Sequence, residues 1–195
     1  FQQWCGINII FNYAQEICVS AGYSITDLFM NIVITGSINL VFTLVAMGTV
    51  DKLGRKKLML FGSGALAIIY ALLGYFYYTS VTGFPLLLLV LLAIAIYAMS
   101  LAPIVWVILS EIFPNRIRGV AMSIATFALW IASALLVQTF PIFNNYLGTS
   151  GTFWLYGIIC ALGFLFVFRK LPETKNKSLE EIEELMVSDQ SKHIQ

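Results

Sequence analysis

Charged residues are scarce in this chain, at 11% of the total, whereas ordinary soluble domains carry about 25%. Hydrophobic residues make up 59%, and the mean hydropathy is +0.88. The apolar runs cover roughly residues 1–19, 28–50, 58–79, 84–110, 120–143 and 152–168. Each approaches the ~20 residues that one membrane crossing needs. The composition therefore predicts an all-α membrane protein in which residues 1–171 form a bundle of six transmembrane helices.

Basic residues are absent from alternate gaps between these runs. Residues 20–27, 80–83 and 144–151 contain no Lys or Arg, and all eleven lie in the two remaining gaps or after the last run, from Arg169 on. The positive-inside rule then places both ends in the cytoplasm. We expect a multi-pass protein of the cytoplasmic membrane, with residues 172–195 as a cytoplasmic tail. Ser178 and Glu181 form a capping box there, which predicts a short amphipathic helix.

Other absences exclude several classes of function. The single His193 and the lack of an acidic residue near the centre of any run argue against an intramembrane enzyme and predict no metal site or cofactor. Three cysteines without CxxC spacing are typical of apolar packing residues. Without a basic patch that includes aromatic residues, nucleic acid is not expected as a partner.

The chain begins at Phe1 rather than Met, and no signal peptide precedes the first apolar run. We expect it to be a fragment whose N-terminal portion is missing.

The first run is unusually rich in side-chain amides for a membrane span. These are Gln2, Gln3, Asn8, Asn12 and Gln15. On a straight helix the two at the start would lie opposite the other three. A local break at Gly6 would turn both sets toward one polar cavity, as in discontinuous transporter helices. The alternative is that single amides form hydrogen bonds between helices.

The fourth run contains Pro103 and, one turn later, Trp106. Proline removes a backbone donor and displaces the preceding turn, so we expect a kink or break here. A tryptophan in mid-membrane lies away from its usual interfacial belt. Its flat face and N–H suit a sugar ring, although core packing is the alternative.

Acidic and basic residues cluster on the side predicted to be cytoplasmic. Glu111 closes the fourth run and needs a cationic partner, for which Arg55 and Arg118 are candidates because guanidinium bonds carboxylates well. Such pairs would latch the cytoplasmic face shut. The alternative is that these loops only set topology.

Four motifs, FQQWCGIN, DKLGRKK, SEIFPNRIRG and PETKNKSLEE, resemble in order and spacing the C-terminal half of the sugar porter family of the major facilitator superfamily. The resemblance covers essentially the whole chain, and it is closest to bacterial xylose/proton symporters. It implies helices seven to twelve of a twelve-helix fold that binds a monosaccharide near the bilayer midplane and alternates access to it. The missing N-terminal half would then be a partner of this chain.

The resemblance also implies roles for individual residues. Sugar-binding residues would be Gln2, Gln3, Asn8, Asn39 and Trp106, with Asn12 and Trp130 as candidate lining residues. The cytoplasmic charge network would comprise Asp51, Arg55, Glu111 and Arg118, and Pro103 would mark the helix break. Asn12 and Leu129 stand where xylose symporters have Tyr and Gln, which leaves the sugar open.

The first hypothesis is secondary active transport of xylose, glucose or a similar monosaccharide by sugar/proton symport. Proton coupling rests on analogy, because the family's coupling carboxylate lies in the first helix, outside this chain. The alternatives are a facilitated-diffusion sugar or polyol carrier and a membrane sugar sensor that does not transport. A sensor would need an output domain larger than this tail.

Overall fold

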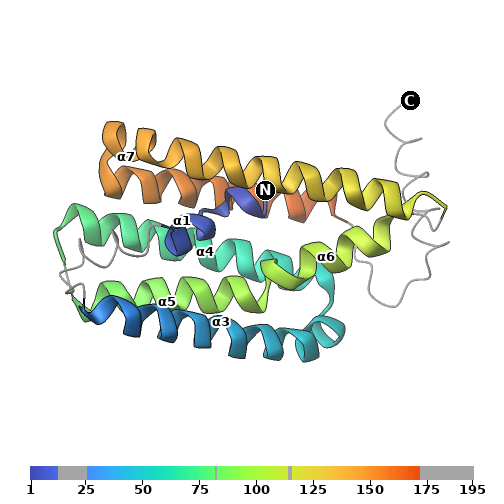
Figure 1. Ribbon diagram of the computed structural model, residues 1–195, viewed down its shortest axis with the longest axis horizontal. Coiled ribbons are helices and arrows are strands. Elements are labelled where there is room, and N and C mark those ends of the chain that lie inside the picture. Colours follow the sequence, from blue (N-terminus) through green and yellow to red (C-terminus); the bar gives the residue numbers. More distant parts are fainter. Residues whose placement is uncertain (13–25, 82, 114–115, 172–195) are drawn as a thin grey trace.

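The computed structural model describes residues 1–12, 26–81, 83–113 and 116–171, and it consists of long helices that run along one axis (Figure 1). In chain order these are η1 (Gln3–Cys5), α1 (Ile7–Asn12), α3 (Thr26–Leu53), α4 (Arg55–Tyr78), α5 (Phe84–Met99), α6 (Leu101–Ile112) and α7 (Arg118–Lys170).

Four helical stretches of the described part are long and apolar enough to cross a membrane: α3, α4, α5 with α6, and α7. Helix α7 turns back on itself, because the backbone of Gly148 has non-helical angles (φ 69°, ψ 173°). We call residues 118–147 the first arm and residues 149–170 the second arm. The reversal lies within the gap predicted between the last two apolar runs. Of the first predicted span only residues 1–12 are described, and the predicted tail helix lies outside the described residues.

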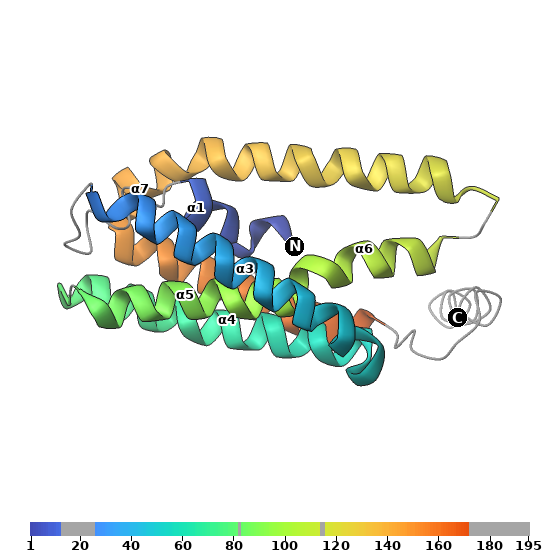
Figure 2. The ribbon, with the colours of Figure 1, turned by 60° about the horizontal axis from the view of Figure 1, so that its bottom comes forward.

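The connections between helices gather at two opposite ends (Figures 1 and 2). One end holds the α3–α4 turn, the end of α6, the start of α7 and its C-terminus. The other holds the α4–α5 connection and the reversal of α7. Every Lys and Arg among the described residues belongs to segments at the first end, which we call the basic end. The charge asymmetry of the sequence is therefore a real separation in space.

The fourth apolar run is interrupted at Ser100 (φ −121°, ψ −81°), between α5 and α6. Pro103 lies three residues later, in the first turn of α6. The break is thus not at the proline itself but in the turn before it, which the ring displaces and where the proline cannot donate to a carbonyl. The backbone N–H of Ser100 bonds Ile96 and Tyr97, so the interruption leaves that donor satisfied.

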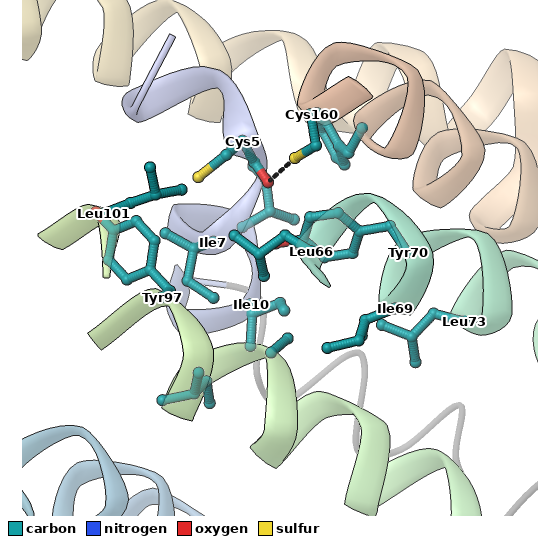
Figure 3. Packing of buried hydrophobic residues seen from close by; sticks show 14 of the residues in the cluster. Cys5, Ile7, Ile10, Leu66, Ile69, Tyr70, Leu73, Tyr97, Leu101 and Cys160 are labelled. Carbon is teal, nitrogen blue, oxygen red and sulfur yellow. Dashed lines mark hydrogen bonds between the residues drawn. The ribbon is translucent and has the colours of Figure 1, made fainter. Parts of the chain in front are cut away.

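The core is formed by α4, α5, α6 and the second arm, and it is closed by the N-terminal residues. Figure 3 shows Cys5, Ile7 and Ile10 between α4, which supplies Leu66 and Tyr70, and the α5–α6 break. At Gly157 the second arm comes so close to α4 that an added Cβ would lie 3.4 Å from the carbonyl oxygen of Ala67. Close packing of this kind drives association of membrane helices, because lipid is as apolar as the side chains.

Candidate functional site

The first apolar run is broken at Gly6, the position where the sequence analysis considered a local break. Gly6 has φ +83° and separates η1 from α1. Glycine adopts this left-handed conformation without steric cost. The ring of Tyr156 covers the position, and an added Cβ would lie 2.8 Å from its Cγ. The backbone angle and the aromatic cover therefore both require glycine.

The break brings Gln3 and Asn8 together. Asn8 Nδ2 donates to Gln3 Oε1 and, at 3.1 Å, to Ser133 Oγ of the first arm. The three side chains are half-buried. We call Gln3, Asn8 and Ser133 the amide network. It is a cluster of donors and acceptors beside the middle of the apolar first arm, which would cost free energy in lipid unless protein, water or a polar ligand satisfies it.

Gln2 does not belong to this network. Its Nε2 donates to the hydroxyl of Tyr97, near the end of α5, at 2.5 Å. Both residues are buried, and the Oε1 of Gln2 has no hydrogen-bond partner among the described residues. The two neighbouring glutamines therefore face different surroundings.

The remaining predicted sugar residues lie outside these contacts. Asn39 is half-buried, and its backbone carbonyl accepts from Thr43 at 2.7 Å. Trp106 and Trp130 are 44% and 67% exposed, so neither is a core packing residue of the described chain. Asn12 ends α1, but its side chain lies outside what the structure describes.

At the basic end, Glu111 pairs with Arg55. Nη2 and Nε of Arg55 both reach Glu111 Oε1, at 2.8 and 3.1 Å. The second candidate partner, Arg118, instead donates from Nε to the carbonyl of Phe113 at 3.3 Å. The Asp51 side chain lies outside the described part. The pair joins the start of α4 to the end of α6.

Three residues that contact this region were not among the candidate site residues predicted from the sequence. They are Ser133, which bonds Asn8, Tyr97, which bonds Gln2, and Tyr156, which covers Gly6. Ser133 had a weak signal, as a hydroxyl within an apolar run. The tyrosines had none, because a tyrosine within an apolar helix is typical of ordinary packing. Their roles follow from contacts with residues 95 to 150 positions away in the chain.

Residues 1–186 match the family model described as "Sugar (and other) transporter". The chain belongs to this sugar transporter family. It is 42% identical over 191 residues to the D-xylose-proton symporter of Escherichia coli (strain K12), covering 95% of this chain and 39% of that protein. It is also 42% identical to the arabinose-proton symporter of Bacillus subtilis (strain 168), over 96% of this chain and 40% of the relative. The glucose facilitated diffusion protein of Zymomonas mobilis matches at 37%, with 95% and 40% covered.

Solved structures agree with this membership. The fold matches the proton:xylose symporter XylE bound to 6-bromo-6-deoxy-D-glucose, with a TM-score of 0.86 and 42% identity over 95% of this chain and 40% of that one. It matches the inward-open xylose transporter XylE from E. coli with a TM-score of 0.83 at 43% identity, over 95% and 39%. The protein is thus a multi-pass membrane protein of the major facilitator superfamily and not an enzyme. The chain spans about two fifths of the length of these relatives.

Proposed function

We propose that this chain is the C-terminal six-helix half of a twelve-helix transporter that carries a monosaccharide across the cytoplasmic membrane by alternating access. Four motifs resemble the second half of sugar porters, and the relatives are about two and a half times as long. We call the protein with both halves the complete transporter. The basic end would then face the cytoplasm, in keeping with the positive-inside rule.

The observation that carries the proposal is the break at Gly6 and the amide network beside it. Oriented side-chain amides and a hydroxyl suit a neutral ligand with many hydroxyl groups, because each hydroxyl both donates and accepts. A lipophilic cation would leave these groups unsatisfied. Gln3, Asn8 and Ser133 would hold the sugar, with Gln2 and Asn39 beside them and Trp106 stacking on its ring. Trp130 and Asn12 are further lining candidates.

We further propose that transport is coupled to protons, as the names of the xylose and arabinose relatives state for those proteins. The coupling carboxylate would lie in the half outside this chain. Facilitated diffusion is the second candidate, because the Zymomonas glucose protein is matched almost as well. The Arg55–Glu111 pair, with Arg118 and Asp51, would latch the cytoplasmic side.

The test is uptake of labelled xylose, glucose, galactose and inositol by the complete transporter in liposomes, with and without an inward proton gradient. Accumulation above equilibrium that depends on the gradient supports symport. Equilibration that ignores the gradient supports a facilitator. Uptake of none of the four would overturn the proposal of a transporter for these compounds and favour a sensor.

A variant test addresses the site. Gln3→Ala and Trp106→Ala in the complete transporter should each weaken sugar binding by about tenfold, the effect of losing roughly one hydrogen bond or stacking contact. Expression and thermal stability should stay near those of the unaltered protein, because both side chains lie outside the main core. Unchanged affinity in both variants would contradict the site assignment.

A further inference from the structure

The contact between Gln2 and Tyr97 joins the two interrupted helices. Gln2 lies four residues before the Gly6 break, and Tyr97 lies three residues before the Ser100 break. The amide Nε2 donates to the phenolic oxygen at 2.5 Å, across 95 positions of sequence. Gln2 is 8% exposed and Tyr97 is 9% exposed, so the bond is shielded from solvent. The pair is therefore well placed to fix the orientation of one amide.

The oxygen of the same amide, Oε1, is buried and lacks a hydrogen-bond donor among the described residues. Leaving a buried amide oxygen without a donor costs free energy, and native proteins rarely do so without a water or ligand there. Nε2 already has a partner in Tyr97, so Oε1 is the atom of this amide that lacks one, and an amide oxygen can only accept. A ligand atom at this position must donate a hydrogen bond.

The neighbouring glutamine has the opposite arrangement. In Gln3 the oxygen is the bonded atom, because Oε1 accepts from Asn8 Nδ2, and Nε2 carries the two N–H donors that this side chain presents. Two adjacent side chains of the same type thus present different groups, and the difference comes from their partners. Such a pair distinguishes a ligand hydroxyl that donates from one that accepts.

We propose that Tyr97 is a positioning residue for sugar recognition: its hydroxyl holds the Gln2 amide so that Oε1 accepts from one hydroxyl of the bound sugar. This inference rests on the proposed function and deepens it. It predicts that one ring position of the sugar must carry a hydrogen-bond donor. Removing the phenolic oxygen frees the amide to rotate and relaxes that requirement.

The first experiment measures sugar affinity of the complete transporter after Tyr97→Phe, which removes the hydroxyl and keeps the ring. Affinity should fall by about five- to tenfold, as expected for one lost hydrogen bond. The matched control is Tyr70→Phe. Tyr70 is fully buried in the same core, and its hydroxyl has no hydrogen-bond partner among the described residues. The sugar affinity of Tyr70→Phe should therefore equal that of the unaltered protein.

The second readout separates positioning from packing. Deoxy and deoxyfluoro analogues are compared at each ring position, since fluorine accepts weakly and never donates. In the unaltered protein the deoxy and the deoxyfluoro analogue should both bind more weakly than the sugar itself, and equally so, at the one ring position whose hydroxyl donates to Gln2. In Tyr97→Phe the fluoro analogue should recover relative to the deoxy analogue at that position alone, because the rotated amide can present Nε2. A purely structural role would weaken all analogues alike.

A third variant guards against loss of folding in Tyr97→Phe. Gln2→Met keeps the side-chain length and removes the amide, so it should abolish the donor requirement at the same ring position. The double variant with Tyr97→Phe should lose no more affinity than Gln2→Met alone, because both changes remove the same hydrogen-bonded pair.

The outcomes distinguish this inference from the proposed function. Absence of sugar binding by the unaltered transporter would overturn both. Normal binding in which Tyr97→Phe behaves as Tyr70→Phe does, or in which Gln2→Met keeps the unaltered discrimination, overturns the role of Tyr97 alone.

Discussion

The two arms of α7 are similar in hydrophobicity but differ in packing. Seven residues of the second arm are buried: Thr152, Phe153, Tyr156, Gly157, Cys160, Gly163 and Val167. The longer first arm buries only Leu136 and Phe140. It leaves large apolar side chains exposed, among them Val120, Ile124, Phe127 and Trp130. Figure 2 shows the second arm among the other helices and the first arm along one side of the bundle.

The comparison teaches that apolar character alone does not say which helix surface carries the fold. A membrane helix can place apolar side chains against protein or lipid at similar cost, so close packing decides which arm belongs to the core. The first arm is tied to the N-terminal residues by a polar contact, Asn8 to Ser133. The arm that contributes to the candidate sugar site is therefore the loosely packed one.

The largest expected difference between the arms is at phenylalanine. Phe153 is 3% exposed and stacks on Tyr77 with ring centroids 5.4 Å apart, whereas Phe127 is 68% exposed. Phe153→Ala should lower the free energy of unfolding by about 3 kcal/mol through the cavity it leaves. Phe127→Ala should cost less than about 1 kcal/mol, as is usual for exposed positions. Denaturation of the purified complete transporter measures both, and an equal cost would show that another surface buries the first arm.

A smaller difference is expected at two left-handed glycines. Gly6→Ala should destabilise by about 2 kcal/mol, because it adds contact with the Tyr156 ring to the backbone strain. Gly148→Ala, at the reversal between the arms, should cost about 1 kcal/mol, since nothing lies within 4 Å of its added Cβ. Thermal unfolding of the two variants tests this. If Gly148→Ala lowered the stability more than Gly6→Ala, contact with the Tyr156 ring would not be what makes Gly6 the more sensitive position.

Loss of the hydrogen bond between Asn8 and Ser133 of the first arm should have a modest effect on sugar affinity. Ser133→Ala should lower sugar affinity by about fivefold, because Asn8 loses one acceptor and its amide is less well oriented. The control on the same arm is Ser123→Ala, whose hydroxyl bonds Gly119 of its own helix at 2.9 Å. Equilibrium binding measures both. Equal affinities would remove Ser133 from the site.

The smallest effect is expected at the ion pair that links α4, in the packed region, to α6, which leads to the first arm. Glu111→Gln should leave sugar affinity unchanged and slow transport by about two- to threefold, in line with a pair that is only partly shielded from solvent. Lys57→Gln, an exposed position near Arg55, is the control. Initial rates in liposomes compare them. A normal rate in Glu111→Gln would eliminate the latch.

Much of the fold could be predicted from the sequence. The gap at 144–151 contains the observed reversal at Gly148, and the run from 84 to 110 corresponds to α5 and α6. The break at Gly6 followed from amides on both sides of a glycine. The position of the second break did not, because a proline disturbs the turn before it, and the interruption is at Ser100.

The site was predictable only in part. Gln3 and Asn8 are close in sequence, so a local break was sufficient to bring them together. Arg55 as the partner of Glu111 was one of two candidates, and geometry selected it. Ser133 and Tyr97 were not predicted as partners, because contacts 125 and 95 positions apart depend on how helices pack and not on any local pattern.

The sequence by itself determined the helical class, the approximate limits of the spans, the end of the bundle at which the basic residues gather and, through its motifs, the family. All of these except the family follow from solvation, because apolar runs of sufficient length leave water and charged loops stay in it. Only the tertiary structure decided which arm of α7 enters the core, which cation Glu111 binds and which side chain each glutamine bonds. Those features depend on the rotation and separation of packed helices, which are set by all the side chains in contact at once.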